Sequence, residues 1–227
     1  MGVRKFVRRL PPWGEFAIVV SLAFGLFISE SVWDLVAASS NQPIISEGDL
    51  RFVLAYELIA FAVLLTFLSV RGWTAASVGL TPSFEDTLLG AAVLAAGWLA
   101  YIVTAVFVAT VWPQAFRMVA DVHLTTGKLN FPTLMAASAV NGFYEELFVC
   151  GYVMTALGKR FSPWTAINIS VIIRFSYHLY QGPLAVVSII PMGLTFAYLY
   201  ARTGRLWPLV VAHAAGDFLA FATHAGG

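Results

Sequence analysis

The chain has 227 residues, of which 59% are hydrophobic and 11% are charged, and its formal net charge is +1. A soluble domain has about 25% charged residues, so this composition excludes an ordinary water-soluble enzyme and indicates an integral membrane protein. Most of the thirteen Lys and Arg residues lie in short segments between long apolar runs, which argues against a nucleic-acid partner. The single cysteine, Cys150, excludes an internal disulfide framework.

Long apolar segments follow one another along the whole chain. A hydrocarbon core of roughly 30 Å needs about 20 apolar residues per helix. The predicted spans are Glu15–Val36, Phe52–Val70, Thr87–Val111, Thr133–Leu157, Pro163–Tyr180, Leu184–Tyr200 and Leu206–Ala222. We therefore expect an all-α, polytopic transmembrane bundle of about seven spans, forming one membrane domain over residues 1–227. Residues 1–132 would supply scaffold helices, and residues 133–222 the helices that carry the polar motifs.

The distribution of lysine and arginine predicts the orientation of these spans, because cytoplasmic connections are enriched in both residues. With the N-terminus in the cytoplasm, the inner segments contain Arg4, Lys5, Arg8, Arg9, Arg71, Lys159, Arg160, Arg202 and Arg205. The outer segments contain Arg51, Arg117 and Lys128. This asymmetry predicts a cytoplasmic N-terminus and an external C-terminus.

Ionisable residues inside the predicted spans mark the place to look for function. A charged side chain near the bilayer centre costs at least about 2.5 to 3.5 kcal/mol, so it normally faces a partner or a wet cavity. The residues concerned are Glu57, Glu145, Glu146, Arg174, His178, His213 and Asp217. All except Glu57 lie in the C-terminal half. Glu57 is isolated from the others, and we expect it to hydrogen-bond between helices.

Helical spacing predicts which of these side chains share a face. Neighbouring residues on a helix lie about 100° apart, so we expect Glu145 and Glu146 to point in different directions and to have separate roles. Residues four apart share a face, which places Glu145 beside Asn141. The same spacing pairs Arg174 with His178 and His213 with Asp217, as in helices that present two ligands to one metal or two groups to one substrate atom.

Three segments, "EELFVCG", "RFSYHLYQGP" and "PLVVAHAAGD", resemble the motifs of the CAAX prenyl endopeptidase and bacteriocin-processing (Abi-type) intramembrane protease family. Those motifs are Glu-Glu-x-x-x-Arg, Phe-x-x-x-His and His-x-x-x-Asn/Asp, on consecutive late helices. The resemblance covers roughly Asn141 to Phe221. It implies peptide hydrolysis within the membrane by water that a glutamate and a histidine activate.

The resemblance also implies a role for each matching residue. Glu145 matches the water-activating glutamate and Glu146 the second, structural one. His178 matches the histidine of the second motif. His213 and Asp217 match the pair attributed to oxyanion stabilisation or, in the metalloprotease description, to metal ligation.

The sequence departs from the family pattern at two positions. Cys150 occupies the position of the motif arginine, and Arg174 occupies that of the motif phenylalanine. An unpaired glutamate and an unpaired arginine are both costly in lipid, and pairing lowers both costs. We therefore expect Arg174 to reach across from the fifth span to Glu146.

The third motif ends in an aspartate here, which bears on mechanism. An ionised Asp217 can only accept hydrogen bonds, so it favours either metal binding or orientation of a charged His213 over direct donation to an oxyanion. Candidate metal ligands are Glu145, His178, His213 and Asp217, a set that suits zinc. If Glu145 bound a metal it would be less free to act as a base, so these two roles compete.

The sequence thus predicts an intramembrane endopeptidase of the type II CAAX prenyl protease-like family, multi-pass in a bacterial inner membrane. Its expected partners are the lipid bilayer and a membrane-associated protein or peptide substrate; the family name suggests prenylated substrates. One alternative is a non-proteolytic membrane immunity or scaffold protein that keeps the fold. Another is a proton-coupled transporter, because buried acids and histidines also serve proton relays.

Overall fold

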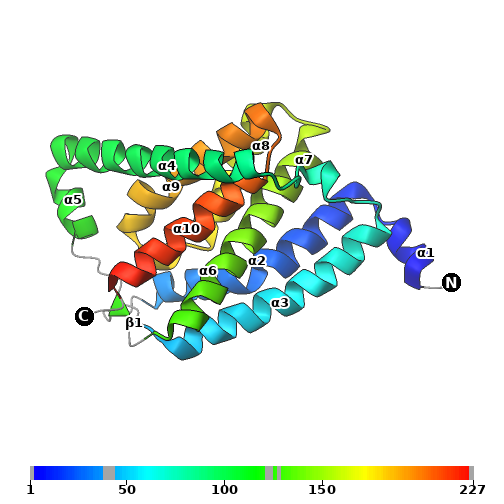
Figure 1. The fold of residues 1–227 in the computed structure, drawn as a ribbon, viewed down its shortest axis with the longest axis horizontal. Helices are drawn as coiled ribbons and strands as arrows, with labels where there is room; N and C mark the ends of the chain where they lie inside the picture. The colour runs from blue at the N-terminus through cyan, green and yellow to red at the C-terminus, as the bar shows by residue number, and fades with distance from the viewer. Residues whose placement is uncertain (1–2, 38–43, 121–124, 127–128, 225–227) are drawn as a thin grey trace.

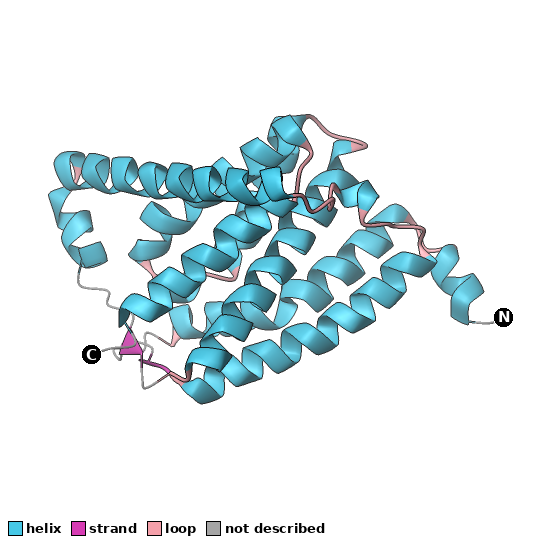
Figure 2. Ribbon diagram, viewed as in Figure 1, coloured by secondary structure: helices cyan, strands magenta, loops and turns pink. Residues whose placement is uncertain are grey.

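A computed structural model shows a bundle of helices packed side by side (Figure 1). It describes residues 3–37, 44–120, 125–126 and 129–224. Lys128, one of the three predicted outer cations, lies outside the described residues. Within the described residues the structure is almost entirely helical, as Figure 2 shows, so the predicted all-α class is confirmed.

The helices are α1 (Val3–Arg8), α2 (Pro12–Val36), α3 (Glu47–Val70), α4 (Phe84–Val111), α5 (Pro113–Ala120), α6 (Phe131–Glu145), α7 (Val153–Gly158), α8 (Pro163–Ser176), α9 (Pro183–Thr203) and α10 (Trp207–His224). A π-helix, Glu146–Tyr152, connects α6 to α7, and two short 3-10 turns, η1 (Ala76–Val78) and η3 (Leu179–Gln181), lie in connections. Two-residue strands, β1 (Ile44–Ile45) and β2 (Thr125–Thr126), pair in parallel.

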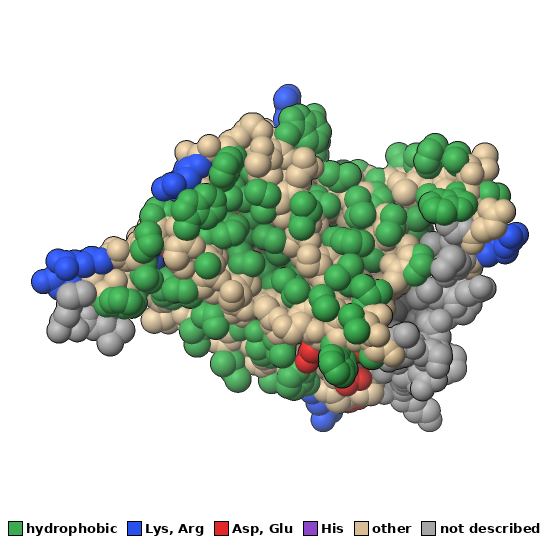
Figure 3. Space-filling view, turned by 180° about the vertical axis from the view of Figure 1, so that it is seen from behind, with side chains coloured by type: hydrophobic (Ala, Val, Ile, Leu, Met, Phe, Trp, Pro, Cys, Tyr) green, Lys and Arg blue, Asp and Glu red, His purple; other side chains and the backbone are tan. Residues whose placement is uncertain are grey.

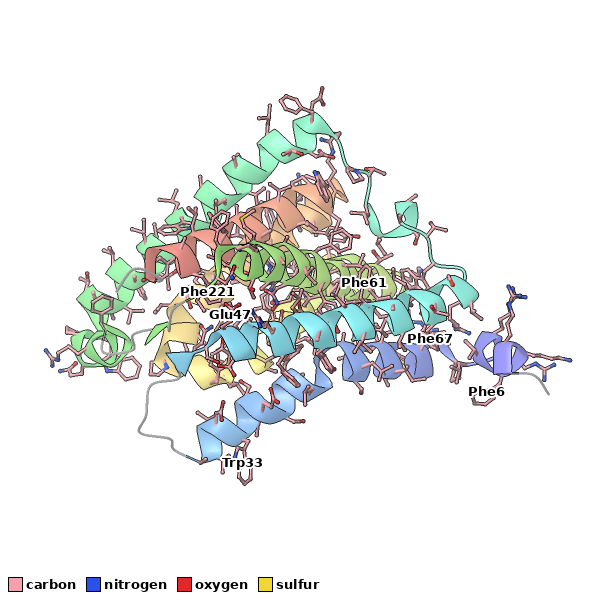
Figure 4. All side chains as sticks on the ribbon, turned by 60° about the horizontal axis from the view of Figure 1, so that its bottom comes forward. Phe6, Trp33, Glu47, Phe61, Phe67 and Phe221 are labelled. Carbon is pink, nitrogen blue, oxygen red and sulfur yellow. The ribbon has the colours of Figure 1, made fainter. Side chains whose placement is uncertain are left out.

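The outer surface of the bundle is apolar, as a lipid-facing surface must be. On α4, Leu99 is 61% exposed, Val106 60% and Phe107 62%. Figure 3 shows hydrophobic side chains over most of one face, with lysine and arginine at its edges. Figure 4 shows Phe6 and Trp33 pointing away from the bundle. Such a surface would be unfavourable in water and is stable in a bilayer.

Each of the seven predicted spans corresponds to helical structure. By length and apolar composition, α2, α3, α4 and most of α9 are long enough to cross a membrane, and α10 is a shorter apolar helix. The fourth predicted span is one continuous helical rod made of α6, the π-helix and α7. The total of seven crossings stays a prediction.

The fifth predicted span ends earlier than expected. Helix α8 stops at Ser176 rather than at Tyr180. Gly182 directly precedes Pro183, the first residue of α9, and its φ of 56° lies in the left-handed region. A proline disfavours helical geometry in the residue before it, so the preceding residues turn through η3 instead of extending α8.

Two glycines hold α10 against its neighbours and thereby position the third motif. A Cβ at Gly142 of α6 would lie 2.6 Å from the backbone nitrogen of Ala214. A Cβ at Gly90 of α4 would lie 2.7 Å from the Cβ of Val211. Only glycine permits such close backbone approach. His213 is consequently brought to α6, which Figure 4 shows between α10 and α3.

The basic connections gather at one end of the bundle. Arg205, before α10, pairs with Asp86 at the start of α4 at 2.9 Å. Arg71, after α3, donates to the backbone oxygen of Val7 in α1 at 3.0 Å. The strand pair and the C-terminal end of α10 lie at the opposite end (Figure 1). This segregation agrees with the predicted inner and outer sides.

Candidate active site

Glu145 and Glu146 lie where α6 ends and the π-helix begins. A π-helix closes i→i+5 hydrogen bonds, so it turns less per residue than an α-helix and neighbouring side chains diverge less. Both carboxylates contact Arg174 and His213. The two carboxylates therefore share partners, which the expectation of separate directions did not include. π-Helical turns are rare in proteins, and those that occur are often found at functional sites.

Arg174, in the last turn of α8, bridges the two glutamates and is only 1% exposed. Its Nη2 donates to Glu146 Oε1 at 2.5 Å, so the predicted pair is present. Its Nη1 lies 3.4 Å from Glu145 Oε2, a contact that the sequence did not suggest. One guanidinium shared by two carboxylates leaves an excess of negative charge, which a protonated histidine can offset.

His213 of α10 supplies that histidine. Its Nδ1 donates to Glu146 Oε1 at 2.7 Å. Its Nε2 lies 3.5 Å from Asp217 Oδ1 and 3.9 Å from Glu145 Oε2. The predicted shared face of His213 and Asp217 is therefore correct. Because Glu146 holds Nδ1, the ring presents Nε2 to Glu145 and Asp217.

Two further side chains bind Glu145 and had not been assigned a role. The hydroxyl of Tyr177 donates to Glu145 Oε2 at 2.6 Å. The amide of Asn141 donates to Glu145 Oε1 at 3.2 Å and to Glu57 Oε1 at 2.7 Å. The i, i+4 spacing indicated the contact between Asn141 and Glu145, whereas nothing in the sequence linked Glu57 to the site. Glu57 is 1% exposed and extends the cluster to α3.

His178 lies beyond α8, in the turn that leads to η3. The expectation that it shares a helical face with Arg174 is wrong, although its Nδ1 still lies 3.0 Å from the backbone oxygen of Arg174. The loop is fixed to α2, because the backbone N–H of Tyr180 donates to Ser31 Oγ at 2.8 Å. His178 lies within electrostatic range of Glu145, without a direct hydrogen bond between them in the described residues.

The cluster has a sealed base and an open rim. The sealed base consists of Glu146, Arg174 and His213, whose exposed fractions are 0%, 1% and 5%. The open rim consists of Glu145, His178 and Asp217. The side chain of Glu145 is 10% exposed and that of Asp217 is 24% exposed, and His178 is half-buried. Glu145 therefore keeps a small accessible edge, while Glu146 keeps none.

The two residues that depart from the family pattern, Cys150 and Arg174, lie close together inside the sealed base. Cys150 is 1% exposed and interacts with both Glu146 and Arg174. The stem of Arg174 crosses Gly193 of α9, where a Cβ would lie 3.2 Å from Arg174 Cδ. The arginine therefore reaches the neighbourhood of Cys150 from another helix, through space that a glycine leaves free.

Zinc does not fit this arrangement of side chains. Among the described residues, no three histidine, cysteine, aspartate or glutamate side chains are grouped as metal ligands. A guanidinium lies against both glutamates, and Nδ1 of His213 is held by Glu146. The four candidate ligands, Glu145, His178, His213 and Asp217, are therefore not arranged to hold a metal in this state. Zinc stays a prediction from the family resemblance.

The fold and the site define a class of protein: a helical membrane protein whose late helices enclose a cluster of carboxylates, histidines and an arginine. Residues 127–219, which include every motif residue, match the family model described as "Type II CAAX prenyl endopeptidase Rce1-like". The predicted resemblance is thus confirmed over this segment, which is similar to the type II CAAX prenyl endopeptidase family. No curated protein and no solved structure matches the chain.

Proposed function

We propose that the chain is an intramembrane endopeptidase in which Glu145 activates water. The observation that carries this proposal is the contrast within the glutamate pair. Glu146 is sealed by Arg174 and His213, whereas Glu145 keeps an exposed edge beside His178 and Asp217. A general base must be able to contact the water from which it takes a proton.

Hydrolysis by these residues would proceed in two stages, attack by water and release of the amine. Glu145 takes a proton from water while the water oxygen attacks the carbonyl carbon of the peptide. The proton then passes to the departing amine, so that one water is consumed and a carboxylic acid and an amine are released. Tyr177 and Asn141 bind the two oxygens of Glu145 and hold the carboxylate in one orientation.

The developing oxyanion needs a donor. A protonated His213 has Nε2 facing the open rim, and Asp217 at 3.5 Å favours its charged form. Asp217 accepts and cannot donate when ionised, so it acts by orienting and charging His213. His178, at the open rim, is the second candidate for proton transfer.

The test is peptide cleavage by the purified chain reconstituted in liposomes. Glu145→Gln and His178→Ala should each lower the cleavage rate at least about a hundredfold, the range for loss of a general acid–base group. Glu30→Gln is the matched control, because Glu30 is an exposed glutamate of α2 outside the cluster. Equal rates in all these variants would refute the proposed roles.

A second function, a non-proteolytic immunity or scaffold protein, is favoured by one observation. Arg174 is drawn into contact with both glutamates, as expected of a cluster that holds helices together. A scaffold would keep its partner binding and its biological effect in Glu145→Gln. A peptidase would lose its effect in that variant while remaining folded, so one variant separates the two functions.

The family name suggests a prenylated protein or peptide as substrate, and the expected location is a bacterial inner membrane. Comparing prenylated and unprenylated versions of one peptide would test the substrate. Elemental analysis of the purified chain, with and without added zinc, would test the metal. Loss of cleavage on chelation and its recovery with zinc would require a rearrangement of Arg174 away from the glutamates.

A further inference from the structure

A second polar cluster lies in a pocket at the end of the bundle where the basic connections gather. The pocket has a volume of about 460 Å³ and is formed by the start of α2, the segment after α3 and the connection from α7 to α8. Its aromatic and charged lining residues are Trp13, Glu15, Phe16, Arg71, Trp73, Lys159 and Arg160. The motif residues of the candidate active site do not line it.

The one carboxylate in this pocket is fully engaged by protein donors. Arg71 Nε hydrogen-bonds to Glu15 Oε2. Glu15 Oε1 accepts from Trp73 Nε1 at 2.8 Å and from the hydroxyl of Tyr152 at 3.1 Å. Arg71 Nη1 donates in addition to the backbone oxygens of Val7 and Arg8 at 3.0 and 2.9 Å. The charges of Glu15 and Arg71 therefore cancel.

Two cations remain without such a partner. Lys159 Nζ lies 4.4 Å from the centre of the Trp73 ring, and the guanidinium of Arg160 lies 5.7 Å from that of Trp13. Neither is ion-paired with a carboxylate of the described residues. The aromatic rings hold both cations at the pocket without neutralising them, so the pocket carries two unpaired positive charges.

Helix α2 adds to the positive potential. Pro12 and Trp13, at its first turn, line the pocket, and no side chain caps this end of the helix. The positive end of the dipole of this 25-residue helix favours an anion. Tryptophan rings at a helix end are also typical of the membrane interface. The two cations, the positive end of the helix dipole and the interfacial rings together favour a phosphate at headgroup depth.

We propose that this pocket binds the phosphate of an anionic lipid headgroup in the cytoplasmic leaflet. The positive-inside orientation places the pocket in the leaflet that attracts basic clusters through its anionic lipids. Lys159 and Arg160 would contact the phosphate, and Trp13 and Trp73 would border the glycerol region. The proposal does not depend on the peptidase function.

The test measures how phosphatidylglycerol shifts the unfolding midpoint of the full chain in detergent micelles, against phosphatidylcholine at equal concentration. Lys159→Gln with Arg160→Gln should weaken the apparent affinity for phosphatidylglycerol about thirtyfold, since each cation near the surface contributes about one factor of five. Arg4→Gln with Lys5→Gln is the matched control, because it removes the same two charge types from exposed positions of α1 outside the pocket. This control should lose clearly less affinity than the pocket variant.

Inorganic phosphate alone distinguishes the two sources of the anion. The lipid proposal requires that millimolar phosphate leave the unfolding midpoint unchanged while phosphatidylglycerol raises it. A shift with phosphate and none with the lipid would overturn the proposal in favour of a soluble ligand. Equal losses in the pocket variant and in the control would also overturn it, because binding would then follow overall charge. No shift in wild type with either probe would reject the pocket as an anion site.

Discussion

Two polar clusters in this protein are built from the same parts and have opposite charge balances. In the candidate active site, Arg174 forms ion pairs with two glutamates, and a tyrosine hydroxyl donates to one of them. In the pocket at the basic end, Arg71 forms an ion pair with one glutamate, Glu15, and a tyrosine hydroxyl again donates to that glutamate. The first cluster has a surplus carboxylate, and the second has surplus cations.

The difference in charge balance suggests a different chemical role for each cluster. A surplus carboxylate near the middle of the bundle can take a proton from water, which suits hydrolysis. Surplus cations at the interface can hold an anion. The depth in the bundle and the sign of the uncompensated charge, rather than the residue types, separate the two clusters.

The largest expected effect comes from breaking the central cluster. Arg174→Ala leaves two buried carboxylates without their cation, so we expect a loss of about 3 to 5 kcal/mol in the free energy of unfolding. Glu146→Ala should cost a similar amount, and the double variant little more than either single one. Unfolding in detergent, followed by circular dichroism, measures all three. Additive losses would contradict a direct pair.

Arg205→Ala is the control for that series. Its pair with Asp86 has a similar distance, 2.9 Å, but the arginine side chain is 52% exposed. Exposed ion pairs contribute about 0 to 1 kcal/mol. A loss as large as that of Arg174→Ala would show that depth does not separate these ion pairs.

Restoring the family pattern should recover much of the loss at the central cluster. Cys150→Arg alone adds a second buried cation, and Arg174→Phe alone removes the existing one, so each should destabilise the protein by about 3 kcal/mol or more. Together they place one arginine beside Glu146 from the π-helix. The double variant should be more stable than either single variant by at least about 1 kcal/mol. Strictly additive unfolding energies would reject the exchange of positions.

Crowding the stem of Arg174 should have an intermediate effect. Gly193→Ala places a Cβ 3.2 Å from Arg174 Cδ, and over-packing a tight site costs about 1 to 3 kcal/mol. Gly97→Ala is the matched control, since its nearest neighbour would be Phe196 at an ordinary 3.6 Å. Thermal unfolding should separate the two variants. Equal melting temperatures would mean that Arg174 does not need the space at Gly193.

The tyrosine hydroxyls should give effects comparable to that of Gly193→Ala. Tyr177→Phe removes a 2.6 Å hydrogen bond to Glu145, and Tyr152→Phe a 3.1 Å bond to Glu15. We expect about 1.5 to 3 kcal/mol for the first, as for hydrogen bonds to charged groups, and less for the second because its bond is longer. Only Tyr177→Phe should also lower peptide cleavage. A larger loss of unfolding free energy in Tyr152→Phe than in Tyr177→Phe would contradict the expected order of the two hydrogen bonds.

Local pattern was enough to predict much of this protein. Hydrophobic runs identified the helices, because lipid requires each spanning segment to satisfy its own backbone. The cost of an unpaired charge in lipid led from Cys150 and Arg174 to the pair with Glu146. Spacing of four residues placed His213 with Asp217 and Asn141 with Glu145, since i and i+4 share a helical face.

The remaining features depended on contacts between residues far apart in the sequence. An α-helical repeat separates Glu145 from Glu146, and the π-helix that brings both to Arg174 has no simple sequence signature. The turn that carries His178 is held by Ser31 of α2. Glu57 appeared isolated because its partner, Asn141, lies on another helix.

The sequence by itself thus determined the membrane class, the helical segments and most of the ionisable residues that form the site, because burial in lipid restricts which residues a span can contain. Only the tertiary structure decided which of two adjacent glutamates stays accessible and which carboxylate neutralises Arg71. Both depend on how helices distant in sequence pack together. Adjacent glutamates look equivalent in a sequence, and the packing around them makes one a candidate base and the other a buried partner of Arg174.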